Sequence, residues 1–180
     1  MEIVSIMGSG SLGRQINLDT FITGLKDEVG DILETNFQSA GIVTVKFGSE
    51  SPAFSIYRTG SFQVRGASDH DDLNDWIDQF LGILSEIGFD IEDAEFEEKT
   101  AVFMDEVQQS VNLEALTIHL GLEFTEYEPE QFPGVVYRPA NQTVTLLVFS
   151  SGKVLVLGTT EQGCAEAAFE SLKKEIRAIS

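Results

Sequence analysis

The sequence predicts an α+β fold made of two pseudo-symmetric β-α-β-β-β-β-α repeats, which share a curved antiparallel sheet and carry their helices on one face only. Three observations lead to this prediction: an internal repeat, short β-type segments separated by turn residues, and an apolar stripe in the helix that closes each copy. At 180 residues, 42% of them hydrophobic, the chain is long enough to bury a core.

The internal repeat consists of two aligned blocks. Residues 16–25 (INLDTFITGL) match residues 111–120 (VNLEALTIHL) at an offset of 95. Residues 55–88 match residues 147–180 without gaps at an offset of 92. Two copies of one module therefore fill the chain. The predicted repeats are residues 1–90 and residues 91–180.

Each repeat begins with a strand-like run and a helix, for which Asn17 and Asn112 are the expected N-caps. Short β-type segments follow, separated by Pro, Asn, Gly and Ser turn signals, and each repeat ends in a long helix whose apolar residues recur every three or four positions. The expected strands of the second repeat are 122–128, 134–138, 143–149 and 153–158. The expected helix stripes are Trp76, Phe80, Ile83, Leu84 and Ile87, and Ala165, Phe169, Leu172, Ile176 and Ile179.

The glycine-rich segment 8–13 (GSGSLG) has the composition of a dinucleotide-binding turn. A phosphate turn needs a helix N-terminus immediately behind its glycines, whereas the helix signal here starts at Asn17. The matching segment of the second repeat, 103–108 (FMDEVQ), contains no glycine at all. We therefore reject dinucleotide binding, which was the only support for a small-molecule enzyme.

Other candidate chemistry is equally sparse. His70 and His119 lie in different copies without partners at metal-ligand spacing, and Cys164 has no histidine placed to activate it. We predict no catalytic residue, no metal and no cofactor.

The composition is strongly acidic, with 30 acidic against 11 basic residues and a formal net charge of -19. Such a charge repels nucleic acid and anionic membranes in ordinary buffer and, taken alone, favours a protein partner or a cationic ligand. The alternative is a cytoplasm with molar salt, where the Debye length falls to about 3 Å and the charge serves solubility. With one cysteine, no leader pattern and no long apolar run, we expect a cytoplasmic protein without a membrane span.

Two segments of the second repeat, 126–138 (EYEPEQFPGVVYR) and 146–158 (LLVFSSGKVLVLG), resemble the TATA-box-binding protein family of archaea and eukaryotes. The acidic composition resembles the versions found in extreme halophiles. The resemblance implies a saddle whose concave sheet face lies in the minor groove of promoter DNA, where apolar side chains wedge between base steps and kink the duplex. It also implies transcription factor B as a partner and RNA polymerase as an indirect one, and an exposed apolar face invites homodimers of the free protein.

The resemblance assigns roles to residues of the second repeat. Phe132 and Phe149 match the intercalating phenylalanines, and Arg138 and Lys153 match the phosphate-contacting basic residues. The implied DNA-binding face includes Leu147, Leu155, Leu157 and Val102, and the implied acidic contacts to transcription factor B are Glu128 and Glu130. For the leucines, alternation along the strand independently predicts a shared face.

The first repeat departs from the family pattern at its DNA-binding positions. Tyr57 stands opposite Phe149, and either Ser39 or Phe37 stands opposite Phe132. Because a tyrosine wedge must desolvate its hydroxyl, at about 1–3 kcal/mol if no hydrogen bond replaces the lost water, we expect a weaker or altered kink there. The remaining departures are Ser55, Gln63 and Arg65 in place of the leucines, Ser61 in place of Lys153 with Arg58 nearby, and Ser5 and Thr100 in place of the family's central asparagines.

Two functions therefore remain open from the sequence. The first is a general or specialised initiation factor that binds and kinks TATA-like promoter DNA and recruits transcription factor B. The alternative is a modulator that keeps the surface for transcription factor B but does not bend DNA productively, which the polar first repeat motivates.

Overall fold

The computed structural model describes residues 1–179 and divides into two compact units. The first-repeat unit is Ser5–Lys99, and the second-repeat unit is Met1–Val4 together with Thr100–Ser180. The opening strands, β1 (Glu2–Ser11) and β6 (Glu95–Glu106), contribute residues to both units. The predicted β-α-β-β-β-β-α order occurs twice, so the α+β fold class is confirmed.

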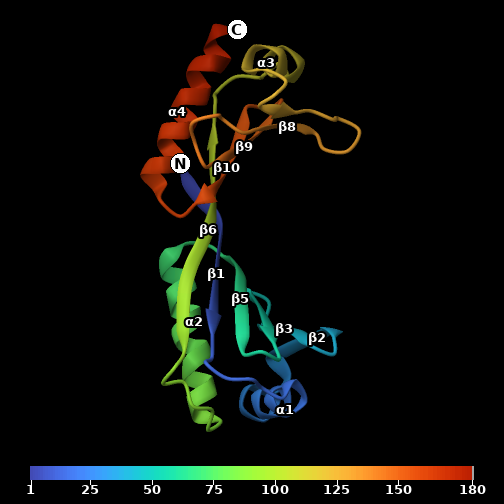
Figure 1. Cartoon of the computed structure of the whole chain (residues 1–180), viewed down its shortest axis with the longest axis vertical. Helices are drawn as coiled ribbons and strands as arrows, with labels where there is room; N and C mark the ends of the chain where they lie inside the picture. The colour runs from blue at the N-terminus through green and yellow to red at the C-terminus, as the bar shows by residue number, and fades with distance from the viewer. Residues whose placement is uncertain (180) are drawn as a thin grey trace. The chain divides into compact units, whose positions relative to one another are not determined.

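The first-repeat unit contains four further strands and two α-helices (Figure 1). Its antiparallel strands are hydrogen-bonded in the order β2-β3-β4-β5-β1. Its elements are α1 (Leu18–Val29), a 3-10 turn (Gly30–Ile32), β2 (Leu33–Ser39), β3 (Ile42–Phe47), β4 (Ala53–Tyr57), β5 (Ser61–Ala67) and α2 (His70–Glu86).

The second-repeat unit repeats this arrangement, with strand order β6-β10-β9-β8-β7. Its elements are α3 (Leu113–Leu120), β7 (Thr125–Glu126), β8 (Gly134–Tyr137), β9 (Thr145–Phe149), β10 (Lys153–Thr159) and α4 (Gln162–Ala178). The predicted strand over 122–128 is wrong, because only two of those residues form β7. Turns replace the rest: the Phe124 amide bonds to the Gly121 carbonyl, and the amides of Gln131 and Phe132 bond to the Glu128 carbonyl.

Both helix starts agree with the sequence. The side chain of Asn17 accepts a hydrogen bond from the amide of Thr20 at 3.0 Å, and that of Asn112 accepts one from the amide of Ala115 at 2.9 Å. Each caps an otherwise unpaired amide in the first turn of its helix. The confirmed caps start α1 and α3 at equivalent places in the two repeats.

Alternation along the strands places one side of each sheet against the helices. In α4 the stripe from Ala165 to Ile176 is buried as predicted, and Ile179 follows the end of the helix and is half-buried. In α2 the prediction is partly wrong, because Leu73 and Ile77 are buried while Trp76 is only half-buried. The actual α2 stripe points at an aromatic cluster of the first-repeat unit. That cluster is Phe47, Phe54, Phe62 and Phe80, with ring centroids 4.8–6.2 Å apart.

The glycines of segment 8–13 serve packing. Gly8 and Gly10 lie inside β1, and a Cβ atom at either position would overlap the Phe96 or Phe62 ring. Those two rings stack at a centroid distance of 6.1 Å. Helix α1 begins only at Leu18, so these glycines do not form a turn between a strand and a helix.

The structure also locates the length difference between the repeats. Nine residues (26–34) separate the end of the matched α1 segment from Thr35, whereas four residues (121–124) separate α3 from Thr125. The hairpin that follows is shorter in the first repeat, where five residues (37–41) correspond to seven residues (127–133) of the second repeat. One difference adds residues to the first repeat and the other removes them from its hairpin tip.

Two tight turns fix the β4–β5 and β9–β10 hairpins, and we expect their glycines to be essential for stability. Gly152 has a φ of 94°, and a Cβ atom there would overlap the carbonyl oxygens of Val107 and Gln109. Gly152→Ala should therefore lower the free energy of unfolding by about 2 kcal/mol or more. Gly88→Ala is the matched control, because Gly88, which follows α2, also has a positive φ of 81° but nothing within 4 Å of a Cβ atom, and it should cost about 1 kcal/mol. Urea unfolding measures both, and equal losses would contradict the steric account.

Candidate nucleic-acid interface

Each unit has one sheet face that its helices do not cover, and we call it the open face. In the second-repeat unit, α4 packs along β10 and α3 contacts β7 and β8 (Figure 1). Both helices lie on the side of the strands opposite to the open face. Val148 and Val154 point to the helices and are fully buried, whereas their neighbours Leu147 and Leu155 are half-buried on the open face. The two faces therefore follow directly from strand alternation.

The open face of the second-repeat unit is apolar. Met104, Leu155, Leu147 and Val136 lie directly opposite one another on β6, β10, β9 and β8. Leu157 lies opposite Val102 in the next row. Sequence reasoning identified the leucines and Val102 but missed Met104, which alternation from Val102 predicts, and Val136, which its pairing with Leu147 brings into the row. The apolar face, as named from here on, is Val102, Met104, Val136, Leu147, Leu155 and Leu157.

Phe132 and Phe149 meet at one end of the apolar face. Their ring centroids are 5.6 Å apart with an interplanar angle of 62°, and both side chains are half-buried. Gly134, opposite Phe149, makes room for this contact, because a Cβ atom there would lie 3.0 Å from Phe132 Cε1 and 3.3 Å from Phe149 Cδ1. The amide of Phe132 donates to the Glu128 carbonyl at 2.9 Å, which fixes the loop that presents the ring.

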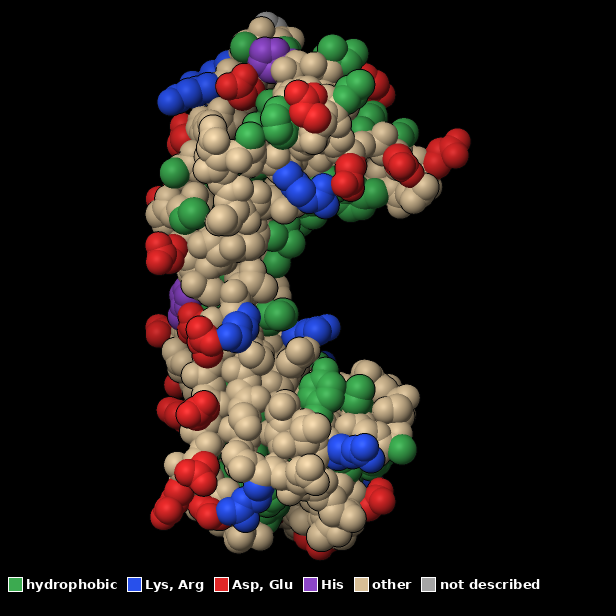
Figure 2. All heavy atoms as spheres, in the orientation of Figure 1, with side chains coloured by type: hydrophobic (Ala, Val, Ile, Leu, Met, Phe, Trp, Pro, Cys, Tyr) green, Lys and Arg blue, Asp and Glu red, His purple; other side chains and the backbone are tan. Residues whose placement is uncertain are grey.

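The charged candidates of the second repeat lie at both ends of this unit's open face, with Lys153 and the loop before β8 near the phenylalanine pair and Arg138 at the other end of β8. Arg138 Nη1 donates to Glu126 Oε1 at 2.8 Å, in an exposed ion pair, and Lys153 is half-buried on β10 opposite Glu106. Glu128 and Glu130 are exposed in the loop before β8. Figure 2 shows acidic side chains gathered at the tip of that loop.

The open face of the first-repeat unit is polar at the matching positions. Ser9, Gln63, Ser55 and Thr44 lie directly opposite one another on β1, β5, β4 and β3. Arg65, exposed in the next row, donates from Nη2 to Gln63 Oε1 at 2.7 Å. Thr44 Oγ1 lies 3.2 Å from Ser55 Oγ, so this polar row is linked by hydrogen bonds between its own side chains.

The first-repeat unit has no aromatic partner beside Tyr57. Ile42 lies opposite Tyr57, at the position that Gly134 occupies opposite Phe149. Of the two residues expected to match Phe132, Ser39 lies opposite Ile42, and Phe37 lies opposite Val43, whose buried side chain faces the helices. The shorter hairpin and the isoleucine together remove the place for a second ring.

The two positions expected to replace central asparagines are half-buried. Thr100 Oγ1 accepts a hydrogen bond from the Gly158 amide at 3.3 Å, where Gly158 forms a bulge in β10. Ser5 lies in β1 between Val4 and the buried Ile6. The hydroxyl of Thr100 thus has a structural partner.

Neither histidine belongs to a metal cluster. His70 Nδ1 lies 2.7 Å from Glu98 Oε2, and His119 Nε2 lies 2.8 Å from Glu175 Oε2. Within residues 1–179, no group of three or more His, Cys, Asp or Glu side chains is placed to bind a metal ion. The helices of this same range are too short or too polar to cross a membrane.

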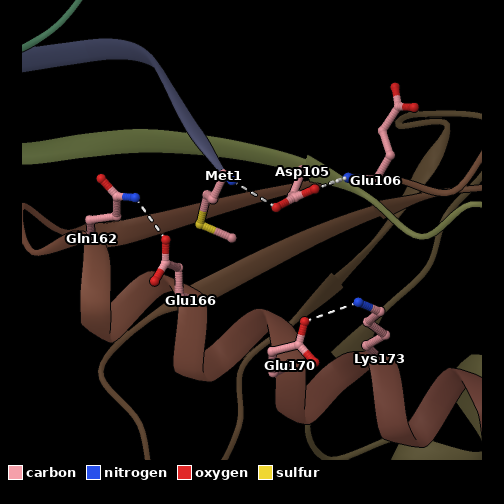
Figure 3. A network of polar contacts seen from close by, with 7 residues as sticks. All are labelled: Met1, Asp105, Glu106, Gln162, Glu166, Glu170 and Lys173. Atoms are coloured by element: carbon pink, nitrogen blue, oxygen red, sulfur yellow. Dashed lines mark hydrogen bonds and ion pairs between the residues drawn. The ribbon is translucent and has the colours of Figure 1, made fainter.

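A polar network lies on the helix-bearing side of the second-repeat unit (Figure 3). The Met1 ammonium contacts Asp105 Oδ2 at 3.0 Å, and the Glu106 amide donates to Asp105 Oδ1 at 2.8 Å. Burial acts to raise the pKa of Asp105, but the Glu106 amide, the Met1 ammonium and Lys173 outweigh it and hold the pKa below its ordinary 3.8. This network belongs to the scaffold and not to the open face.

The two β-α-β-β-β-β-α units, each with one helix-free sheet face, define a doubled α+β repeat protein. The family model described as "Transcription factor TFIID (or TATA-binding protein, TBP)" matches residues 1–87 and 96–179. The chain belongs to the TATA-binding protein family, a family of DNA-binding transcription factors and not of enzymes.

Relatives and a solved structure agree with this assignment. The chain is 33% identical over 181 residues to TATA-box-binding protein C of Halobacterium salinarum, covering 99% of this chain and 98% of that protein. It is 32% identical over 180 residues to the TATA-box-binding protein of Archaeoglobus fulgidus, covering 99% and 96%. The structure of Methanococcus jannaschii TBP superposes with a TM-score of 0.75 at 28% identity, covering 99% of this chain and 98% of that one.

The lowered pKa of Asp105 predicts a pH-dependent contribution to stability. A carboxylate whose pKa falls on folding stabilises the protein above its unfolded pKa, and this contribution is lost as the pH falls through the folded pKa. Asp105→Asn should therefore lower the thermal midpoint relative to the parent at pH 6, and the difference should shrink below about pH 3.8. Glu106→Gln, at the exposed neighbouring position, is the control. A difference that stays constant between pH 6 and pH 3 would contradict the assignment.

Proposed function

We propose that this protein is a transcription initiation factor that binds the minor groove of TATA-like promoter DNA, kinks the duplex and recruits transcription factor B. The observation that supports this most directly is the apolar face with Phe132 and Phe149 at its end. A continuous exposed apolar surface on a folded unit favours burial against a ligand. A duplex whose minor groove is opened and unstacked presents an apolar surface of this kind.

The aromatic pair is suited to a wedge. Both rings are half-buried and held edge to face by the Glu128 carbonyl contact and by the space above Gly134. A side chain that inserts between base steps must be positioned before it meets DNA, since ordering it at that moment would reduce affinity. In the first-repeat unit Tyr57 stands beside Ile42, so we expect the larger kink under the second repeat.

The acidic composition is compatible with DNA binding because the charge is unevenly placed. Acidic side chains line the α2 side of the first-repeat unit (Figure 2), away from its open face. On the open face of the second-repeat unit, the carboxylates that border the apolar face each have a cation nearby: Glu126 pairs with Arg138, and Glu106 lies opposite Lys153. With few cations available, affinity must come largely from apolar burial and water release, which molar salt does not weaken.

The second candidate function is a modulator that binds transcription factor B without productive bending. The polar row Ser9, Gln63, Ser55 and Thr44 favours it, because a face of this kind offers less apolar burial to drive a kink. Both functions use the acidic loop before β8 as the contact for transcription factor B, and RNA polymerase would follow indirectly. They differ only in whether DNA is bent.

The wedge residues test the leading proposal. Phe132→Ala with Phe149→Ala should reduce affinity for an A·T-rich promoter duplex in molar potassium chloride at least about tenfold and should lower energy transfer between dyes at the duplex ends. Ile118→Ala with Leu122→Ala is the matched control, because those apolar side chains are 76% and 74% exposed and lie outside the open face. Bending that survives the double substitution would contradict the wedge role of the two rings, and a parent protein that does not bend the duplex would favour the modulator.

The acidic loop tests the protein partner separately. Glu128→Lys with Glu130→Lys should abolish binding of transcription factor B to the protein and leave DNA affinity within about threefold, since both side chains are exposed in the loop and outside the apolar face. Glu123→Lys with Glu161→Lys, which reverses two exposed acids outside that loop in the same unit, is the control for charge alone. Equal losses in the two variants would refute a specific contact. Native gel shift with and without transcription factor B measures both.

A further inference from the structure

The open faces of the two repeats differ most in their capacity for hydrogen bonding at matched places in the sheet. We propose that they require different base pairs: the second-repeat unit requires A·T pairs in the minor groove that it covers, whereas the first-repeat unit also accepts G·C pairs. This inference rests on the proposed minor-groove function. The matched positions are Ser9 with Met104, Thr44 with Val136, Ser55 with Leu147, and Gln63 with Leu155.

The donors and acceptors in the minor groove explain why the difference between the two faces affects base-pair preference. A·T and T·A pairs present only acceptors there, whereas a G·C pair adds the exocyclic N2 amino group of guanine as a donor. When a protein surface covers the groove, that amino group loses its water and needs an acceptor in exchange. A face that supplies no acceptor therefore selects against guanine.

Across four neighbouring strands, the row of the second-repeat unit supplies no side-chain acceptor, because Met104, Leu155, Leu147 and Val136 are all apolar. On the edge strand β7 the row continues with Glu126, opposite Val136, and its carboxylate accepts from Arg138 at 2.8 Å. In the next row, Thr145 lies opposite Leu157. A guanine amino group covered by these four apolar side chains would be left unpaired.

The first-repeat unit supplies both donors and acceptors. The hydroxyls of Ser9, Ser55 and Thr44 can accept from a guanine amino group or donate to adenine and thymine acceptors, because each carries one proton and two lone pairs. Thr44 Oγ1 accepts from Gln38 Nε2 at 2.9 Å and lies 3.2 Å from Ser55 Oγ, and these two contacts use only part of the capacity of the three hydroxyls. This row therefore adapts to either kind of base pair.

Gln63 adds directed donors to the same row. Its Oε1 accepts from Arg65 Nη2 at 2.7 Å, which orients the carboxamide and leaves the Nε2 hydrogens for base acceptors. Acceptors are present in the minor groove of every base pair. Gln63 thus contributes affinity without discriminating A·T from G·C.

The test uses three duplexes that differ in two base pairs per half: A·T in both halves, G·C in one half, and G·C in both. Because the protein can bind in either direction, it should place the first repeat on the G·C half. In molar potassium chloride, we expect the one-half duplex to bind within about threefold of the A·T duplex, and the duplex with G·C in both halves to lose at least about tenfold.

The direction in which the protein sits on the one-half duplex is a second readout, which affinity measurements alone do not give. Cys164, the one cysteine of the chain, is exposed at the start of α4 in the second-repeat unit and can carry a donor dye. On the one-half duplex, energy transfer should be stronger to an acceptor at the A·T end than to one at the G·C end. Equal transfer to both ends would overturn the proposal.

Matched variants exchange the two specificities. Ser55→Leu with Gln63→Leu should make the one-half duplex lose as much affinity as the duplex with G·C in both halves. Leu147→Ser with Leu155→Gln should bring the affinity for the duplex with G·C in both halves to within about threefold of the affinity for the A·T duplex. Thermal unfolding shows whether each variant is folded, and the parent duplex series tests the proposal without them.

The failure of this inference is distinct from failure of the proposed function. A parent protein that binds the A·T duplex but loses at least about tenfold on the one-half duplex overturns the inference alone. Tolerance of G·C in both halves by the parent also overturns it. A parent protein that binds none of the three duplexes overturns minor-groove binding itself.

Discussion

The period of two along each antiparallel strand is the constraint on which both the core and the open faces depend. Val148 and Val154 fill the helix side and Leu147 and Leu155 point the other way, because successive side chains of a strand lie on opposite faces. A slip of one residue would carry the apolar face into the core and the core into solvent. The bulge at Gly158, with a φ of 98°, absorbs one extra residue without inverting the strand before it.

The two repeats place different residues on the core side of their strands and on the open face. The first-repeat unit packs Phe62 and Phe96 against the glycines of β1, whereas the second-repeat unit buries Phe103 on the matching strand. The first repeat thus has glycines on its opening strand and large rings on the neighbouring strands, whereas the second repeat has a large ring on the opening strand itself. Because helix packing requires only that the core volume be filled, the outer faces are free to become polar in one repeat and apolar in the other.

The sequence predicts those features that depend on local patterns. The asparagine caps, the closing helices and the alternation around Leu147 and Leu155 need only neighbouring residues, and all are found. The α2 stripe was misplaced because apolar residues lie on two adjoining faces of α2, and the contact of Phe80 with Phe54 and Phe62 from distant strands selects between them. Alternation along β6 from Val102 predicts Met104 on the same face, whereas only the pairing of Val136 with Leu147 places Val136 in the row.

The hairpin tips show a further limit of gapless alignment. The net difference of three residues between the repeats is an excess of five before β2 and a deficit of two at the β2–β3 tip. An alignment that places one gap cannot separate them, and it leaves Ser39 and Phe37 as competing matches for Phe132. Only the pairing of Ile42 with Tyr57 shows that a side chain fills the space which Gly134 leaves open.

Unequal faces have a consequence for a protein with internal pseudo-symmetry. If both repeats presented the same surface, the two orientations on a nearly symmetric duplex would have nearly equal free energies, and any partner held by the loop before β8 would face either direction. A difference of about 1.4 kcal/mol between the halves is enough for a tenfold preference. One unsatisfied guanine amino group supplies a difference of that size. The hydroxyls of the first repeat make a symmetric kink less favourable. The same hydroxyls are therefore the groups best able to favour one orientation of the protein on the duplex.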